Sequence, residues 1–271
     1  MREFKMFQAD AFTNSVFAGN PAAVLVLNDW LPETEMLAIA AENNLAETAF
    51  VTSEADGYAI RWFTPTQEAA FCGHATLASA HVLATEFGAT GPLRFATREV
   101  GTLIVTPEGN GRYGMDLPSL PPTPLHSTPG IFATLFPAGW IAACRNFENI
   151  FVELASADEV LTYVPDSAAI ETLGPQGLCI TAAGGHTHDG KPVDFVSRYF
   201  APAAGIAEDP ATGSTHSTLI PYWTAKLGAR PLSAFQASPR GGYLEGYLAG
   251  DRVRLTGRAA TFMRATICLP G

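Results

Sequence analysis

Charged residues are scarce in this sequence of 271 residues. Asp, Glu, Lys and Arg together make up 15% of it, against about 25% in a typical globular domain, while hydrophobic residues reach 47%. A chain this apolar and this long buries a sizeable core, which excludes intrinsic disorder. Domains average roughly 100–200 residues, so we expect one large domain or two modest ones.

Long hydrophobic runs and paired cysteines are also absent. No stretch approaches the ~18 consecutive apolar residues of a membrane helix, and charges interrupt the first ten residues, so we expect neither a membrane span nor a signal peptide. The cysteines Cys72, Cys144, Cys179 and Cys268 form no CxxC pair. This spacing predicts reduced thiols in a cytoplasmic protein, and the neighbours of the last three are typical of buried structural thiols.

Positive charge is in short supply as well. The formal net charge is −10 and the pI is about 5.0, with acidic and basic residues scattered along the chain. Such a diffuse negative field argues against nucleic acid and membrane surfaces as partners. It leaves a small anionic substrate open, because a local site can overrule the net charge.

An internal repeat is present. Arg61-Trp62-Phe63-Thr64-Pro65 recurs 137 positions later as Arg198-Tyr199-Phe200-Ala201-Pro202, and the segment from Gly73 to Gly88 aligns with that from Gly213 to Gly228 at a shift of 140. The second copy therefore carries three additional residues between these segments. We expect two copies of one structural unit.

Each copy has the same expected order of elements. A segment rich in aromatic and branched residues, 58–63 or 194–200, predicts a strand. A proline-containing loop follows, and then a helix, 75–87 or 215–227, whose nearly uncharged faces indicate burial on all sides. A glycine stands after each helix, where a C-cap is expected.

The segment 118–124 separates the copies. It holds four prolines in seven residues, which excludes a helix or a central strand. We therefore expect domains over residues 1–120 and 130–271, with the active site between them and the last strand free to pack on the first half. Further helices are expected over 32–44 and 167–173.

Two dipeptides occupy the same place in the repeat, Gly73-His74 and Gly213-Ser214. Each lies at the N-terminal end of a predicted helix, where free N–H groups and the helix dipole favour a carboxylate or phosphate. Glycine lets such a ligand approach the backbone. These glycines could instead only shape a tight turn, but their duplication favours the binding role.

Four motifs resemble those of the PhzF-like isomerases of phenazine biosynthesis. They are GNPAAV at 19–24, NLAETAF at 44–50, FCGHAT at 71–76 and EDPATGS at 208–214, in the expected order across most of the chain. The resemblance implies an α+β, diaminopimelate-epimerase-like fold, with two pseudo-symmetric domains that each curl a mostly antiparallel β-sheet or barrel around a central buried helix. It also implies a homodimer that works without a cofactor.

The resemblance implies roles for single residues. Glu47 corresponds to the catalytic acid and base, and His74 and Asp209 correspond to residues that flank the substrate. The family's best-described reaction isomerises trans-2,3-dihydro-3-hydroxyanthranilate by a proton shift. His74 could alternatively cap its own helix. The positions that hold the substrate carboxylate correspond to Gly73, Gly213 and Ser214.

The surroundings of Glu47 support acid–base chemistry independently. Leu45, Ala46, Ala49 and Phe50 form an apolar setting that would raise the pKa of its carboxyl group, and a carboxyl poised nearer neutrality both gives and takes a proton. The alternative is a solvated glutamate at a helix end. The family often has serine before this glutamate, so Ala46 suggests a different substrate of the same general type.

Cys72 supports a second hypothesis. Related epimerases and racemases use two thiols, one from each half, to remove and return an α-proton, and Cys72 stands where the first would be. Its counterpart in the second copy is Asp209 or Thr212, so a two-thiol racemase is not expected. A mixed pair of Cys72 and Asp209 stays open.

The sequence therefore predicts a cofactor-independent isomerase that shifts a proton on a small carboxylate. An amino-acid epimerase or racemase using Cys72 is the alternative, and a non-catalytic protein that binds small acids is a more distant one. The GxGxxG pattern at 109–114 precedes no helix and predicts a hairpin turn. His186-Thr187-His188 has no third ligand nearby, which predicts a loop, so no metal is expected.

Overall fold

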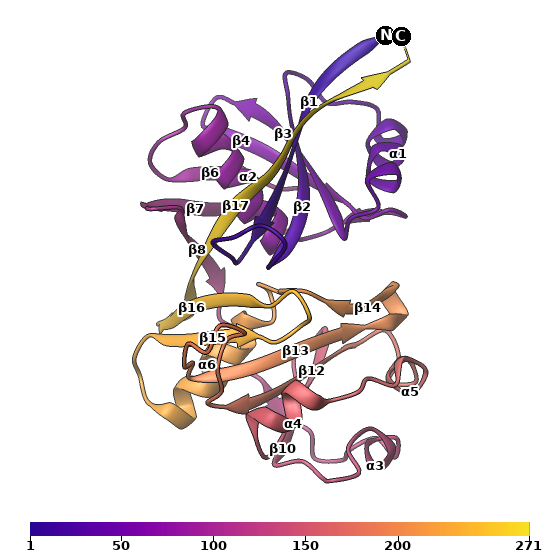
Figure 1. Cartoon of the computed structure of the whole chain (residues 1–271), viewed down its shortest axis with the longest axis vertical. Helices are drawn as coiled ribbons and strands as arrows, with labels where there is room; N and C mark the ends of the chain where they lie inside the picture. Colours follow the sequence, from indigo (N-terminus) through magenta and orange to yellow (C-terminus); the bar gives the residue numbers. More distant parts are fainter. Residues whose placement is uncertain (271) are drawn as a thin grey trace. The chain divides into compact units, whose positions relative to one another are not determined.

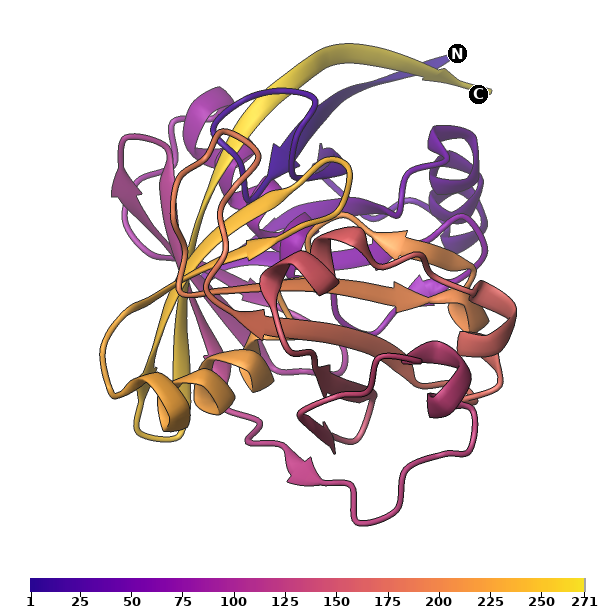
Figure 2. The ribbon, with the colours of Figure 1, turned by 60° about the horizontal axis from the view of Figure 1, so that its bottom comes forward.

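The computed structural model describes residues 1–270 and divides into two compact units. The first unit comprises residues 1–116 and the chain from Thr256 onward, and the second comprises Leu117–Leu255. This differs from the expected boundaries, because residues 117–129 belong to the second unit and most of the last strand belongs to the first. Each unit combines strands with a few helices (Figures 1 and 2).

The first unit has two helices, α1 and α2. Within residues 1–270, no helix is both long and apolar enough to cross a membrane. Elements that begin in this unit are β1 (Arg2–Ala11), β2 (Asn20–Leu27), α1 (Glu33–Asn43), β3 (Glu47–Glu54), β4 (Gly57–Phe63), β5 (Glu68–Ala69), α2 (Gly73–Glu86), β6 (Leu93–Ala96), β7 (Thr102–Gly109) and β8 (Arg112–Pro118).

The second unit has shorter helices around one longer helix, α6. Its last strand continues into the first unit. Elements that begin here are β9 (Thr123–Pro124), α3 (Phe132–Leu135), β10 (Ala142–Arg145), β11 (Asn149–Glu153), α4 (Ala157–Thr162), α5 (Ser167–Glu171), β12 (Gly177–Ala183), β13 (Phe195–Ala201), the 3-10 helix η1 (Pro202–Ala204), β14 (Ile206–Asp209), α6 (His216–Leu227), β15 (Leu232–Gln236), β16 (Gly242–Ala249) and β17 (Arg252–Leu269).

Strand pairing follows the same order in both units, which confirms the internal repeat. In the first unit β2–β3 is parallel, β3–β4 and β4–β5 are antiparallel, β4–β6 is parallel and β6–β7 is antiparallel. In the second unit β11–β12, β12–β13, β13–β14, β13–β15 and β15–β16 have the same succession of directions.

Helix α2 is buried along most of its length, as its uncharged sequence predicts. Every residue from Gly73 to Leu83 is buried. The hydroxyl groups of Thr76 and Ser79 donate to carbonyls one turn earlier, at 2.6 and 2.7 Å, which satisfies them inside the core. In the second unit α6 is likewise buried from His216 to Pro221.

Turn residues lie where the sequence places them. Gly88, with a φ of 70°, follows α2, and Gly228, with a φ of 95°, ends α6. Asn110 and Gly111 adopt φ values of 52° and 69° and join β7 to β8. The GxGxxG segment therefore forms the predicted hairpin turn.

A bidentate ion pair occurs at the same place in each unit. In the first unit Arg61 of β4 donates from Nε and Nη2 to Glu68 of β5, at 2.7 and 2.6 Å. In the second unit Arg198 of β13 donates in the same way to Glu208 of β14, at 2.7 and 2.8 Å. Each arginine is 7% exposed. Two charge-assisted bonds of fixed geometry tie each strand to the segment that leads to the buried helix.

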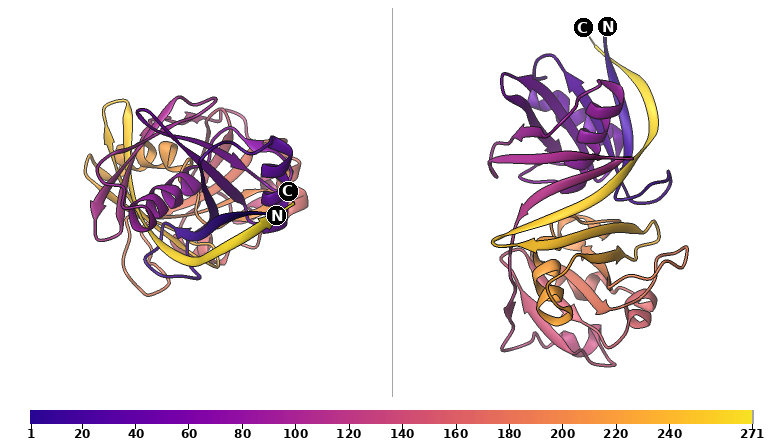
Figure 3. Two further views of the ribbon diagram at one scale, coloured as in Figure 1. Left: turned by 90° about the horizontal axis from the view of Figure 1, so that it is seen from above. Right: turned by 90° about the vertical axis from the view of Figure 1, so that its left-hand side faces the viewer.

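The two chain termini form a ribbon of β1 and β17, in which Arg2 lies opposite Leu269, and Figure 3 shows the termini side by side. Alternate residues of a strand face opposite sides. Ile267 and Leu269 pack against the core beneath α1, whereas Cys268 is exposed. The expectation of a buried Cys268 is therefore wrong, although Cys144 and Cys179 are buried as expected.

Replacing Glu208 by Gln is expected to lower the free energy of unfolding by about 3–5 kcal/mol, since it leaves Arg198 buried without its countercharge. Chemical denaturation measures the loss. The matched control is Glu86→Gln, which removes the partner of Arg264, a side chain that is 65% exposed. We expect the control to cost less than about 1 kcal/mol, and equal losses in both variants would contradict the prediction.

Candidate active site

The structure brings Glu47 and His74 together in the first unit. Glu47 is the first residue of β3, and His74 is the second residue of α2. Nε2 of the imidazole lies 3.2 Å from Oε2 of the carboxylate, and the two side chains are 6% and 13% exposed. The pair is therefore largely shielded from water, and a proton can pass between its members over a short distance.

Short turns deliver both residues to this position. Helix α1 ends at Asn44, which adopts a left-handed conformation with a φ of 50°, and two further residues lead into β3. Parallel pairing with β2 then sets Glu47 beside Ala22. On the other side, Cys72 is extended and serves as the N-cap residue of α2, so the first helical turn carries His74.

Asn20 determines the tautomer of His74. Asn20 is 0% exposed, and its Nδ2 lies 3.2 Å from Nδ1 of the imidazole. An amide NH₂ group only donates, so Nδ1 accepts and the proton of a neutral ring resides on Nε2, which faces Glu47. Both ring nitrogens are thus engaged by neighbouring elements, which is incompatible with His74 as the cap of its own helix.

Cys72 lies against the same imidazole. Its Sγ is 3.4 Å from Nδ1 and 3.9 Å from Nε2 of His74, and the residue is 5% exposed. Candidate ligand atoms of Glu47, Cys72 and His74 all lie within 4.8 Å of one another. A carboxylate, a thiol and an imidazole therefore converge at the N-terminal end of α2, and they are the side chains here that could hold a metal ion.

Asp209 ends strand β14 in the second unit and is 6% exposed. The hydroxyl group of Thr212 donates to its carboxylate. Gln236, which is 0% exposed, accepts from the backbone N–H of Thr212 at 2.7 Å and donates to the carbonyl of Asp209 at 2.8 Å. These bonds fix the turn that precedes Gly213, which is buried, and Ser214, which is half-buried.

His216, the first residue of α6, braces the same turn from the other side. Its Nδ1 donates to the carbonyl of Thr212 at 2.9 Å, so Gln236 and His216 hold the N–H and the C=O of one residue. Burial lowers the pKa of His216 to about 4, and the ring is therefore neutral near pH 7. Its role is to fix the turn rather than to exchange protons with solvent.

The sequence-predicted residues fall into two groups, one in each unit. Asn20, Gln236 and His216 were missed. Asn20 lies within the GNPAAV motif, and Gln236 stands where the first copy has Ala96, so a difference between the repeats was the available signal. The first group is Glu47, Cys72, Gly73 and His74, and the second is Asp209, Gly213 and Ser214.

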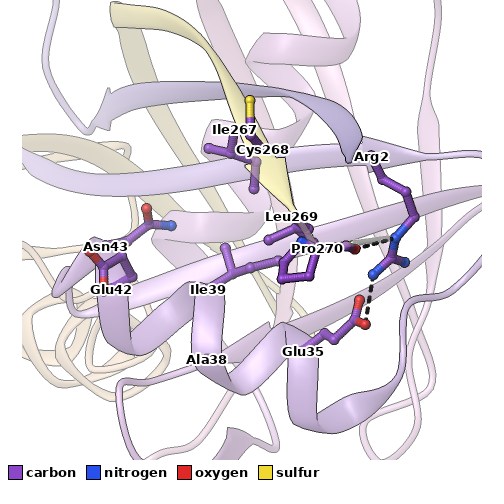
Figure 4. A pocket seen from close by; sticks show the side chains of 10 residues that line it. All are labelled: Arg2, Glu35, Ala38, Ile39, Glu42, Asn43, Ile267, Cys268, Leu269 and Pro270. Carbon is purple, nitrogen blue, oxygen red and sulfur yellow. Dashed lines mark hydrogen bonds and ion pairs between the residues drawn. The ribbon is translucent and has the colours of Figure 1, made fainter.

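A separate pocket in the first unit contains none of these residues. This cavity of about 400 Å³ lies between α1 and the end of β17 (Figure 4), where Ile39, Ile267 and Leu269 are among the residues that line it. Arg2 and Glu35 form an ion pair at 2.8 Å beside it. Cys268 also borders the pocket, but its thiol points away from α1 (Figure 4). An apolar wall beside one ion pair offers no acid–base pair like that of Glu47 and His74.

Comparisons with known proteins give a consistent result. A family model described as phenazine biosynthesis-like protein, PhzC-PhzF, matches residues 9–265. An uncharacterized isomerase of Pseudomonas aeruginosa is 42% identical over 98% of this chain and 100% of its own length. A crystal structure of a PhzF-family protein from Enterococcus faecalis is 40% identical, covers 99% of this chain and 100% of its own, and superposes with a TM-score of 0.92.

A more distant structure extends the likeness of fold. A probable proline racemase from Agrobacterium radiobacter, 10% identical, covers 98% of this chain and 93% of its own with a TM-score of 0.64. At that identity the likeness concerns the fold alone. Together with the structure from Enterococcus faecalis, it confirms the expected epimerase-like α+β fold.

Replacing Asn20 by Ala is expected to remove the bond to Nδ1 and let the neutral ring of His74 populate both tautomers. Long-range ¹H–¹⁵N NMR spectra distinguish the two forms. The signals of His81, which bonds to Tyr113 and Thr261, serve as an internal control and should not move. A single Nε2–H form of His74 in the variant would show that Asn20 does not determine the tautomer.

The low pKa of His216 predicts a pH-dependent stability. Because the unfolded ring takes up a proton near pH 6.5 and the folded ring only near pH 4, the stability is complete above pH 6.5 and is lost as the pH falls towards 4, by roughly 3 kcal/mol. Urea denaturation across this range tests it. His216→Gln should flatten the slope, and the same change at exposed His188 should leave it intact.

Proposed function

The chain belongs to the PhzC-PhzF family of phenazine biosynthesis-like proteins, and on that premise we propose that it is an isomerase in which Glu47 carries the migrating proton. Its close relatives include proteins named as isomerases, so an enzyme of the isomerase or epimerase type is established. This sets aside the hypothesis of a non-catalytic binder of small acids. The identity of the proton carrier and of the substrate are the proposal.

The observation that carries the proposal is the 3.2 Å approach of His74 Nε2 to Glu47 Oε2. With Nδ1 held by Asn20, the ring presents an N–H group to the carboxylate. Such a donor orients the carboxylate and stabilises its charge without protonating it. Glu47 is thereby kept ready to accept a proton from carbon.

The reaction needs only one proton and one carboxylate. Glu47 removes a proton from a carbon of the substrate, the electron pair moves along the conjugated system, and the protonated Glu47 returns the proton to a second carbon. Nothing is oxidised or reduced, and substrate and product have the same composition. A positioned acid–base group of this kind contributes about 10²–10⁴-fold in rate.

Backbone N–H groups at the helix N-termini are the proposed anchors for a carboxylate. The first turn of α2 begins at Gly73, next to Glu47 and His74, and the turn before α6 contains Gly213 and Ser214. Unpaired N–H groups and the positive end of the helix dipole attract anions at such positions. We assign Asp209 the role of orienting the substrate, on the resemblance of its motif.

A small unsaturated or amino-substituted carboxylate is the proposed substrate class. The family's reaction on trans-2,3-dihydro-3-hydroxyanthranilate provides the first compound to test. Ala46 bears no hydroxyl group where relatives often have serine, so a related compound fits this chain better if the first is not converted.

A second candidate function rests on the position of Cys72. Its Sγ lies 3.4 Å from the imidazole of His74, a distance at which a thiol and a base exchange a proton. An epimerase would use this thiol to remove an α-proton. Replacement of Cys72 by Ala with no change in turnover would dismiss that mechanism.

Replacing Glu47 by Gln is expected to lower turnover by at least ~100-fold while the protein stays folded, because the amide cannot accept the proton. The assay follows trans-2,3-dihydro-3-hydroxyanthranilate and a panel of small unsaturated carboxylates by NMR in deuterated buffer. Conversion should place deuterium at the new C–H bond. The matched control is Glu42→Gln on the exposed face of α1, which should retain full activity.

Retention of activity within tenfold in Glu47→Gln would remove this residue from the mechanism. Conversion of a substrate without deuterium at the new C–H bond would point to direct transfer of the proton, shielded from solvent. Loss of activity in both glutamate variants would indicate a general effect of charge rather than catalysis.

A further inference from the structure

The three groups that converge beside α2 are a complete set of zinc ligands. Zn²⁺ in proteins is bound by cysteine thiolate, histidine nitrogen and carboxylate oxygen, and sites with three protein ligands leave a fourth position open to water. Glu47, Cys72 and His74 supply one ligand of each type, with their candidate atoms within 4.8 Å of one another. They come from β3, from the N-cap of α2 and from its first turn.

The distances fit a tetrahedral ion. Ligand atoms at the usual zinc bond lengths stand about 3.3–3.8 Å apart in a tetrahedron. Around Nε2 of His74, Oε2 of Glu47 lies at 3.2 Å and Sγ of Cys72 lies at 3.9 Å. Shifts of a few tenths of an ångström place these atoms at the distances that an ion requires.

Charge and surroundings also suit a divalent cation. A thiolate and a carboxylate together neutralise Zn²⁺, which removes most of the cost of holding the ion in a largely buried place. Asn20 lies behind the imidazole, at Nδ1. Rotation of its amide group would present Oδ1 to an Nδ1–H, the arrangement that commonly supports a histidine ligated through Nε2.

We propose that Glu47, Cys72 and His74 form a binding site for Zn²⁺ or a similar thiophilic divalent cation, with one coordination position open. This differs from the expectation of no metal, which considered only His186 and His188. The metal would occupy the lone pairs of Glu47 and His74 that proton transfer needs. Zn²⁺ would therefore inhibit the isomerase; this consequence rests on the proposed function, whereas the binding itself does not.

Cobalt spectroscopy tests the site without an enzyme assay. Co²⁺ added to chelator-treated protein should give a thiolate-to-cobalt charge-transfer band in the near ultraviolet and intense visible bands of a four-coordinate ion. Zn²⁺ should abolish both sets of bands by displacement. Cys72→Ala should lose the charge-transfer band, and the matched control Cys268→Ala, which removes the exposed thiol, should keep it.

Competition with a chromophoric chelator measures the affinity for Zn²⁺. Loss of supporting groups around a metal typically costs about 10–100-fold in affinity, so loss of the thiolate ligand in Cys72→Ala should cost at least ~100-fold. Cys72→Ser, close in size, provides a second variant if the alanine protein is poorly folded. His74 should also change its NMR signals from an Nε2–H to an Nδ1–H form when Zn²⁺ is added.

Absence of a charge-transfer band in the wild-type protein would overturn the proposal, and so would a band that disappears in Cys268→Ala but persists in Cys72→Ala. The two proposals fail separately. Tight Zn²⁺ binding with full turnover in Glu47→Gln would retain the metal site and refute the mechanism. Inactivity of Glu47→Gln in a protein that binds no metal would do the reverse.

Discussion

A buried arginine held at two nitrogens by one glutamate is the constraint on which each unit depends. Arg61 and Arg198 lie on equivalent strands, and their partners Glu68 and Glu208 lie on the short strands that follow. Because Glu208 directly precedes Asp209, the ion pair also positions the site carboxylate. Glu68 similarly begins the segment that ends at the N-cap of α2. An interaction that secures the fold thus sets where the polar groups of each site lie.

The repeated frame carries different chemistry in its two copies. In the first, the start of the buried helix bears an imidazole whose nitrogens are engaged by Asn20 and Glu47. In the second, the corresponding turn is fixed through the backbone of Thr212 by Gln236 and His216. One copy therefore holds groups able to exchange protons, whereas the other holds a rigid turn beside a single carboxylate. Duplication preserved the strand order and left the helix starts free to diverge.

Much of the fold could be predicted from the sequence, because periodic burial and the repeat are local or alignable signals. The buried helices, their terminal glycines and the hairpin at 109–114 all follow from residue types. Contacts between distant segments could not be predicted in this way. The bond between Asn20 and His74 spans 54 positions, and no local pattern marks it. Cys268 was misjudged because its apolar neighbours lie on the other face of a two-stranded ribbon.

Strand β17 carries the chain from the second unit back to the first, where it pairs with β1 as far as Arg2 and Leu269. The first unit is thus built from both ends of the described chain, and the second unit is contiguous in sequence. During synthesis at about 5–20 residues per second, β1 waits roughly 10–50 s for this partner. Throughout that time a nascent chain on the ribosome exposes one edge of its first strand. Such an edge invites pairing with other chains, so the order of translation makes this strand a natural client of chaperones.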